Sequence, residues 1–389
     1  MVYVSISRTL AGLLTAACLV PTVGCESTGG APTESTSTTG TPDASTTAST
    51  TASSGASGGA SGGPEVLLDN DPAFPFGPPI AGPKIPGYVI TNDLVGQSLF
   101  DAFEVMAIDD PTHGTVKYVD SATAWSKGLV SVDGQTGHAR IAVESQTVAT
   151  TTGRESVRLR SKLSFNEGLF LIDVTHLPQG NAVWPSFWTL GAGSWPAGGE
   201  IDIIEGVNDA SHNSTTLHTS VDCSMAGVDA AATMTGTYGE RDCNAGDKDA
   251  GMPYLGCGTS GPTGSFGPQL NAAGGGVFAM KRTSESIDVW FWPRASIPAD
   301  VATGLHPTPA TWGLPTSHFA LGGACSAGHF SEQRLILNTT LCGDWAGGVF
   351  DGPGGKGPWA CADYVKGNPS AFKQAFWDIA WLRTFEYQP

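Results

Sequence analysis

The sequence predicts an all-β protein, folded as a two-sheet sandwich or barrel in a single domain. Of the 389 residues, 52 are glycine and 26 are proline, which is typical of turn-rich β proteins. Short segments rich in β-branched and aromatic residues are separated by Gly, Pro, Asn and Asp turns, and several alternate with a period of two. We find neither a βαβ rhythm nor an internal repeat of roughly 20–50 residues, which argues against a parallel α/β sheet and a solenoid.

The charge balance narrows the classes of partner. The formal net charge is −17, and 14% of the residues are charged while 40% are hydrophobic. A strongly acidic chain disfavours nucleic acid and an anionic membrane surface as partners. The composition therefore predicts an extracellular protein with a large core and a neutral substrate.

Residues 1–25 have the features of an export signal. An arginine precedes an apolar stretch (residues 10–23) that is too short to span a bilayer comfortably. The following Gly24–Cys25 resembles the cleavage site of a bacterial lipoprotein, in which Cys25 carries the lipid. Thr22 stands three positions before the cysteine, where a larger aliphatic residue is usual. Two alternatives stay open: a lipoprotein anchored at Cys25, or an ordinary secreted protein.

Residues 26–64 form a low-complexity linker of Ser, Thr, Gly and Ala. The segment contains no aromatic residue and no Lys or Arg, so burial cannot offset the entropy lost on ordering it. We therefore predict a flexible tether or, in a eukaryotic source, an O-glycosylated stalk. The folded domain is expected to cover residues 65–389.

Candidate strands follow one another along this domain. In residues 286–294, Ile287, Val289 and Phe291 share one face, and the two tryptophans between them share the other. The same criteria predict strands over residues 139–145, 156–165, 168–177, 183–191, 200–206, 215–220, 276–282, 334–340 and 379–387. Only residues 296–301 and 369–379 suggest short helices.

The segment GGEIDIIEGVN, residues 198–208, carries three carboxylates among isoleucines. Carboxylates buried in a β-prone segment are unfavourable unless they have partners or a task. On a regular strand Glu200 and Asp202 share a face, and Glu205 points to the opposite face. One extra residue at Ile203–Ile204, a β-bulge, would bring Glu205 onto the same face, and bulges are frequent beside active sites.

Three carboxylates on one face fit the chemistry of a retaining glycosidase. With the bulge counted, Glu200 and Glu205 are about 13 Å apart along the backbone. Side chains that lean inward bring their carboxyl groups to about 5–5.5 Å, where one serves as nucleophile and the other as general acid/base. Asp202 between them is expected to hold the two glutamates in different ionisation states.

An exposed polar face or a calcium site is the alternative interpretation of these carboxylates. Three tryptophans in the preceding segment, Trp184, Trp188 and Trp195, favour the saccharide interpretation. Aromatic faces stack on the apolar faces of sugar rings, while carboxylates and amides bind the hydroxyl groups. The conjunction of both residue types therefore predicts a saccharide cleft.

The segment WPSFWTLGAGSWPAGGEIDIIEGVN resembles the active-site strand pair of glycoside hydrolase family 16, specifically the fungal-type endo-1,3(4)-β-glucanases and laminarinases. Four further segments resemble that group in the same order: DPTHGTVKYVDSATAWSKGLV, SVRLRSKLSFNEGLFLIDVTHLP, GGGVFAMKRTSESIDVWFWPRASIPADV and LNTTLCGDWAG. The resemblance extends from about Tyr88 to the C-terminus.

The resemblance implies a jelly-roll β-sandwich whose concave sheet forms an open glucan-binding cleft. Position by position, Glu200 matches the nucleophile, Glu205 the general acid/base and Asp202 the assisting carboxylate. It further implies a set of residues at or beside the substrate: Trp188, Trp195, His218, Arg158 and Trp345. One departure is Lys281–Arg282, where related enzymes tend to carry an acidic residue and Trp, a change expected to alter packing or a distal subsite.

Three functions remain open. The first is retaining endo-hydrolysis of β-1,3-glucan or mixed-linked β-1,3-1,4-glucan, with Glu200 and Glu205 as catalysts. The second is a cell-wall glucan transglycosylase, since an acceptor sugar competes with water for the covalent intermediate. The third is a non-catalytic glucan-binding surface protein, disfavoured because both glutamates are present.

The expected cofactors and partners follow from this chemistry. The reaction needs no metal or cofactor, and a structural calcium suits such sandwiches although no residue pattern here specifies one. The partner is a β-glucan polysaccharide and not nucleic acid. We expect a monomer that is exported, and held at a membrane only if Cys25 is lipidated.

Six cysteines lie in the predicted domain. An even number in an exported chain favours disulfides, and the absence of a C-x-x-C pair argues against a zinc or redox motif. We expect pairing within Cys223/Cys243/Cys257 or within Cys325/Cys342/Cys361. Asn213 and Asn338 begin N-x-S/T sequons, which matter only in a eukaryotic secretory pathway.

Overall fold

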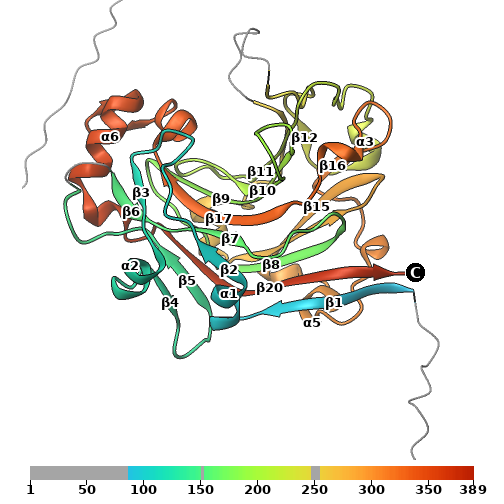
Figure 1. The fold of residues 1–389 in the computed structure, drawn as a ribbon, viewed down its shortest axis with the longest axis horizontal. Helices are drawn as coiled ribbons and strands as arrows, with labels where there is room; N and C mark the ends of the chain where they lie inside the picture. Colours follow the sequence, from blue (N-terminus) through green and yellow to red (C-terminus); the bar gives the residue numbers. More distant parts are fainter. Residues whose placement is uncertain (1–85, 150–152, 247–254) are drawn as a thin grey trace, which may run out of the picture. The chain divides into compact units, whose positions relative to one another are not determined.

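The computed structural model describes residues 86–149, 153–246 and 255–389. In this part of the chain two large antiparallel sheets pack face to face, which confirms the predicted all-β sandwich (Figure 1). A strand forms in each of the predicted strand segments. The predicted leader (1–25), the linker (26–64) and the domain start at residue 65 lie outside the described residues.

One sheet, which we call the outer sheet, has eight strands. Its order is β16 (Ser317–Ala320), β15 (Ser286–Pro293), β14 (Gly276–Arg282), β8 (Gly168–His176), β20 (Phe376–Gln388), β5 (Ala139–Ala142) and β4 (Val130–Val132). The eighth strand, β1 (Gly87–Leu94), pairs with the second half of β20. Because β20 is 13 residues long, one of its edges accommodates both β5 and β1.

The second sheet, which we call the cleft sheet, also has eight strands. Its order is β12 (Thr237–Tyr238), β13 (Cys257–Ser260), β11 (Ser214–His218), β10 (Glu200–Glu205), β9 (Val183–Leu190), β17 (Arg334–Leu341), β7 (Arg158–Ser161) and β2 (Phe103–Val105). Figure 1 shows this sheet curving over the outer sheet, with β10 near its middle. The carboxylate-bearing strand is therefore supported by paired strands on both sides.

Short elements connect the strands. Two-stranded pairs form between β3 (Val116–Tyr118) and β6 (Arg154–Ser156), which are parallel, and between β18 (Asp351–Gly352) and β19 (Gly355–Lys356). The α-helices are α1 (Gln97–Ala102), α2 (Ser121–Ser126), α3 (Ala230–Thr233), α4 (Gly267–Ala272), α5 (Ala299–Thr303) and α6 (Gly357–Gly367). Single turns of other helix types are η2 (Arg294–Ser296), η3 (Pro309–Thr311), η4 (Ala327–His329), η5 (Gly343–Gly347, a π-helix) and η6 (Pro369–Phe372). No helix within the described ranges is both long and apolar enough for a membrane span.

The two predicted helices fare differently. Residues 296–301 lead into α5, as expected. The helix predicted over 369–379 is wrong beyond its first turn, because only η6 is helical and β20 begins at Phe376. From there Trp377 and Ile379 are buried at a spacing of two residues, which is the pattern of a strand.

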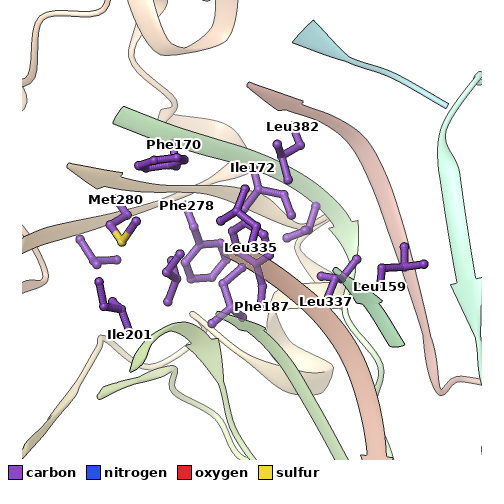
Figure 2. Packing of buried hydrophobic residues seen from close by; sticks show 14 of the residues in the cluster. Leu159, Phe170, Ile172, Phe187, Ile201, Phe278, Met280, Leu335, Leu337 and Leu382 are labelled. Atoms are coloured by element: carbon purple, nitrogen blue, oxygen red, sulfur yellow. The ribbon is translucent and has the colours of Figure 1, made fainter. Parts of the chain in front are cut away.

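The main core lies between the two sheets (Figure 2). Phe170, Ile172 and Phe278 from the outer sheet meet Phe187 and other apolar side chains from the cleft sheet. Each of these side chains is at most 4% exposed. Truncation of such a residue, for example Phe187→Ala, should lower the free energy of unfolding by about 3–5 kcal/mol. The core thus fixes the strands that carry the polar side chains of the opposite face.

The described cysteines form three disulfides. Cys243 bonds to Cys257 and Cys342 to Cys361, within the expected groups. The third bond, between Cys223 and Cys325, joins the two groups across 102 residues, so the expectation of pairing only within each group is wrong. The long connection could not be foreseen because strands distant in sequence are neighbours in a sandwich. Three disulfides are the chemistry of an oxidising compartment and agree with export.

Candidate active site

The register of β10 contains the predicted bulge. Between Asp202 and Glu205, three steps on β10 oppose only two steps on β11, from Thr216 to Ser214. The pairing with β9 slips at the same place, where Ile203 has no partner. One extra residue is therefore inserted at the predicted position, and the alternation of side chains resets there.

The bulge sorts the side chains of β10 into two sets. Its isoleucines all enter the core and are at most 1% exposed: Ile201, Ile203 and Ile204. Its carboxylates all point the other way, where indole and imidazole groups meet them: Glu200, Asp202 and Glu205. A strand without the extra residue would have driven one glutamate into the core.

Glu205 is held by two neighbours from β9. The indole Nε1 of Trp184 donates to Glu205 Oε1 at 2.9 Å, and Ser186 Oγ lies 3.4 Å from the same oxygen. Ser186 is the cross-strand partner of Glu205. The edge of Trp184 meets the ring of Trp345 at 5.7 Å between centroids, in a T-shaped contact. The predicted Trp345 is thus connected to Glu205 through one intervening side chain.

Glu200 and Asp202 share the other end of the site with two predicted residues. The indole Nε1 of Trp195 donates to Glu200 Oε2 at 2.8 Å, while the tryptophan stays 42% exposed. His218 is the cross-strand partner of Glu200, and its Nε2 lies 3.1 Å from Asp202 Oδ2. Trp195 and His218 face each other at 6.1 Å between ring centroids. The structure therefore brings together four of the predicted residues at this end.

Burial raises the pKa of all three carboxyl groups, and charge repulsion adds to the increase for the two glutamates. Burial is the largest cause for each, and the charge of Asp202 further raises the pKa values of Glu200 and Glu205. Hydrogen bonds from Trp195 and Trp184 oppose these increases without cancelling them. The three groups titrate as a coupled set, and at least one proton stays in the site at neutral pH.

Asp202 is the most deeply placed of the three, at 2% exposed. Within the described residues its Oδ2 has no hydrogen-bond partner, although His218 Nε2 lies 3.1 Å away. A proton held between Asp202 and the adjacent Glu200 would provide the missing hydrogen bond. The geometry therefore suits a shared proton.

Trp188 and Arg158 are more buried than side chains that simply stack on a sugar ring would be. Trp188 is 9% and Arg158 6% exposed, and the guanidinium lies 4.9 Å above the indole. Trp188 Nε1 donates to Asn338 Oδ1 at 2.7 Å, and Asn338 Nδ2 donates to the Tyr118 hydroxyl at 3.1 Å. These side chains form a hydrogen-bonded floor of the site. It lies next to Asp202, because Asp202 is the cross-strand partner of Trp188.

One group of side chains has the spacing of a metal site. Ligand atoms of Glu200, Asp202 and His218 lie within 4.8 Å of one another, and in the described part of the chain no other such group occurs. Glu200 already accepts a hydrogen bond from Trp195. The raised pKa values also favour a proton between these carboxyls over two bare negative charges.

Neither sequon presents its asparagine for glycosylation. Asn213 is 4% and Asn338 5% exposed, and both amides are engaged in hydrogen bonds. Both asparagines have a structural role inside the protein, and Asn213 hydrogen-bonds to the backbone of the bulge.

Two residues missed as site residues in the sequence analysis are Trp184 and Ser186. The sequence indicates Trp184 only as an aromatic residue near the carboxylates, and it does not indicate Ser186. Both are identified by the register, because the bulge places Ser186 directly opposite Glu205. A period-two projection of β9 from Trp188 through Ser186 to Trp184 would have indicated them.

The Lys281–Arg282 departure lies on β14 of the outer sheet, away from these carboxylates. Lys281 Nζ is 2.9 Å from Asp288 Oδ2, and Arg282 donates to the carbonyl oxygen of Phe330. Burial lowers the pKa of Arg282 to about 10. Both side chains are thus engaged by neighbours in this chain, and the expected effect on packing or on a distal subsite stays a prediction.

Known proteins resemble this chain over most of its described length. A family model described as "XgeA-like, catalytic GH16 domain" matches residues 103–385. A protein named "Probable glycosidase" from Schizosaccharomyces pombe is 40% identical over 307 residues, covering 78% of this chain and 70% of the relative. An endo-1,3(4)-beta-glucanase from Arthroderma benhamiae is 39% identical over 307 residues, covering 77% of this chain and 65% of the relative. The match to a relative from Aspergillus clavatus, 41% identical, covers 46% of that protein.

Solved structures match the same region. Laminarinase 16A from Phanerochaete chrysosporium, of glycoside hydrolase family 16, holds β-glucans in its donor and acceptor sites. It is 42% identical with a TM-score of 0.71, and the match covers 77% of this chain and 99% of that chain. An elongating family 16 β-1,3-glucosyltransferase is 37% identical with a TM-score of 0.70, covering 77% and 100%. The predicted jelly-roll sandwich is confirmed by these structures.

Proposed function

The chain belongs to glycoside hydrolase family 16, and on that premise we propose that it is a retaining endo-hydrolase of β-1,3-glucan or mixed-linked β-1,3-1,4-glucan. The observation that carries the proposal is the bulge, which gathers Glu200, Asp202 and Glu205 on one face with an indole N–H on each glutamate. The chain spans about half to 70% of the length of the curated relatives cited above, so the activity is proposed for the residues it contains.

In the first step Glu205 acts as general acid. Burial and the charge of Asp202 raise its pKa, so it keeps a proton at a pH where an ordinary glutamate has lost it. Glu205 protonates the glycosidic oxygen while Glu200 attacks the anomeric carbon. The bond to the leaving chain breaks and a covalent glycosyl-enzyme forms.

In the second step Glu205 acts as general base on a water molecule, which attacks the anomeric carbon and releases Glu200. Two inversions leave the configuration retained. The N–H of Trp195 stabilises the departing carboxylate of Glu200, and the Asp202 proton can move between the adjacent carboxyls as the charge changes. This reaction uses the chain's own side chains and requires no metal.

Exposure and ring contacts support a proposal for where the substrate binds. Trp195 is an exposed aromatic surface at the Glu200 end, and the half-buried Trp345 contacts Trp184, which donates to Glu205. We propose that sugar rings contact Trp195 and Trp345, while Arg158 and Trp188 shape the floor between them. His218 is proposed to orient Asp202 from across the strand pair.

A second candidate is transglycosylation at the same site. The 37% identical glucosyltransferase supports keeping this alternative, because it shares the fold and the chain covers all of it. Water and an acceptor sugar compete for one intermediate. New reducing ends in proportion to bond cleavage would identify hydrolysis, while longer products without them would identify transfer.

The proposal is tested with purified full-length protein on laminarin, lichenan, cellulose and agarose. Release of reducing ends from laminarin or lichenan, abolished in Glu200→Gln, is the expected result. Activity that survives in Glu200→Gln would refute the assigned site. Inactivity of the wild-type protein on all four polymers, with no elongated products, would refute both enzymatic candidates.

We further propose that the protein works outside the cytoplasm as a monomer. The three disulfides and the fungal relatives support export. Lipid attachment at Cys25 lies outside the described residues and stays a prediction. Mass spectrometry of the mature N-terminus would distinguish a lipidated Cys25 from an unmodified, secreted start.

A further inference from the structure

We propose that Asn213 is a positioning residue, which fixes the β-bulge of β10 and thereby aims Glu205 into the cleft. The proposal rests on the function proposed above. Asn213 immediately precedes β11 and is 4% exposed. Its side-chain amide offers an acceptor and a donor pair in one planar group.

The Asn213 amide bonds the backbone within the bulge, at Ile203, and directly after it, at Glu205. Its Nδ2 donates to the carbonyl oxygen of Ile203 at 2.8 Å, and its Oδ1 accepts from the backbone N–H of Glu205 at 3.0 Å. The first of these groups lies inside the stretch from Asp202 to Glu205 over which the register slips, and the second lies at its end. A buried carbonyl and N–H that leave the regular ladder need other partners. One side chain supplies both, so we call this arrangement the bulge clamp.

The bulge clamp is itself held rigidly. The backbone N–H of Asn213 donates to Ser265 Oγ at 2.8 Å, and Ser265 Oγ donates to the carbonyl oxygen of Pro262 at 2.6 Å. Asn213 Nδ2 also lies 3.2 Å from Thr215 Oγ1. The orientation of the amide follows from its partners, because a carbonyl can only accept and a backbone N–H can only donate.

Removal of the bulge clamp would affect the two glutamates unequally. Glu200 lies on the regular part of β10, before the slip, and its ladder partner is His218. Glu205 follows directly after the slip, and its backbone N–H would lose its acceptor. We therefore expect proton transfer by Glu205 to suffer while nucleophilic attack by Glu200 is kept.

Two substrates separate these effects in full-length Asn213→Ala. On laminarin, kcat/KM should fall about 10–100-fold, because the leaving sugar needs protonation by an aimed acid. On a dinitrophenyl laminarioligosaccharide, whose leaving group departs without protonation, kcat/KM should change less than about threefold. Asn213→Asp keeps an acceptor for Glu205 and loses the donor to Ile203, so it should show a smaller loss with the same substrate dependence.

Asn271→Ala is the matched control. Asn271 clamps the backbone of Leu177 in the same way, with Oδ1 accepting from the N–H and Nδ2 donating to the carbonyl oxygen, each at 2.8 Å. This variant should lower the melting temperature and leave kcat/KM unchanged on both substrates. Equal losses on both substrates in Asn213→Ala and Asn213→Asp, or no loss in either, would overturn the bulge clamp. If wild-type protein cleaves neither substrate, the proposed function fails instead.

Discussion

Two buried aspartates, each beside a histidine, occupy opposite chemical situations in the two sheets. Asp288 of the outer sheet is 5% exposed and is bonded by His318 Nδ1 at 2.6 Å, by Ser286 Oγ at 2.7 Å and by Lys281 Nζ at 2.9 Å. Burial alone would raise its pKa, but these three partners outweigh burial and lower it. Asp202 of the cleft sheet is 2% exposed, and burial raises its pKa to about 8.

The comparison distinguishes a buried carboxylate that stabilises the fold from one that is proposed to take part in catalysis. Asp288 has the partners that a buried charge needs and keeps its charge. Asp202 faces two more carboxyls and lacks such partners, so the folded protein takes up a proton there instead. Perturbed carboxyl groups in a cleft are typical of catalytic sites, and their strain is offset by the rest of the fold.

The largest expected effect comes from replacing the two glutamates of the cleft sheet. Glu200→Gln and Glu205→Gln should each lower kcat on laminarin by at least about 1,000-fold, because each removes the proposed nucleophile or the proposed acid of the reaction. Circular dichroism should show the native fold in both variants. Asp288→Asn, measured in the same assay, serves as the control and should retain the wild-type rate per folded molecule. Near wild-type turnover in either glutamine variant would contradict the assignment.

The next largest effect is expected on stability, when the charge of Asp288 in the outer sheet is removed. Asp288→Asn should lower the free energy of unfolding by about 2–4 kcal/mol, because Lys281 loses its buried counter-ion. The loss should be present at neutral pH, where the wild-type carboxylate is charged. It should shrink as the pH falls through the lowered pKa of Asp288. Urea denaturation at several pH values measures both, and a pH-independent loss would mean that the charge is not the cause.

Asp202→Asn should have the opposite effect on stability. The raised pKa of Asp202 means that ionisation opposes folding above the ordinary carboxyl pKa, so the amide should stabilise the fold by about 1–2 kcal/mol near pH 8. Below about pH 4 both the folded and the unfolded carboxyl are protonated, and the gain should vanish. A destabilised Asp202→Asn protein at pH 8 would show that the aspartate is a structural partner like Asp288.

The pH dependence of activity provides a second test of the difference between Asp202 and Asp288. The charge of Asp202 raises the pKa of Glu205, so Asp202→Asn should move the alkaline limb of kcat/KM to lower pH. Its maximal rate should fall about tenfold, less than in the glutamate variants. An unchanged profile would restrict Asp202 to a structural role.

The smallest expected effect concerns one hydrogen bond. Trp184→Phe keeps an aromatic ring against Trp345 and removes the N–H that donates to Glu205. Because that N–H favours the charged form of Glu205, its loss should raise the pKa of Glu205 and shift the alkaline limb upward. A reduction of about threefold to tenfold in kcat should accompany the shift. A downward shift would contradict the assigned hydrogen bond.

The sequence predicted the centre of the site better than its surroundings. The spacing of two and then three residues, with isoleucines at every remaining position, indicated that a bulge between Asp202 and Glu205 would bring the three carboxylates together, and the register contains it. The indole donors could not be derived in this way, because the meeting of Trp184 with Glu205 depends on how β9 is aligned with β10. Nothing in the sequence around Asn213 distinguishes an asparagine that bonds a β-bulge from an asparagine that carries a glycan.

Non-local features escaped prediction for the same reason. The Cys223–Cys325 bond joins segments 102 residues apart, and spacing along the chain holds no information about such a pair. Helix α6 begins in a Gly- and Pro-rich stretch that local propensity assigns to a loop. Its helical state is supported by packing of Cys361 and Val365 in a small core, which only the folded chain provides.

The proposed mechanism requires that Glu200 forms a covalent bond to the substrate. A fluorinated laminarioligosaccharyl fluoride reacts in the first step and is slow in the second, so it traps the glycosyl-enzyme for peptide mass spectrometry. We predict one equivalent of label on Glu200, and none in Glu200→Gln. Label on another residue, or continued turnover of laminarin without any labelled enzyme, would contradict the account.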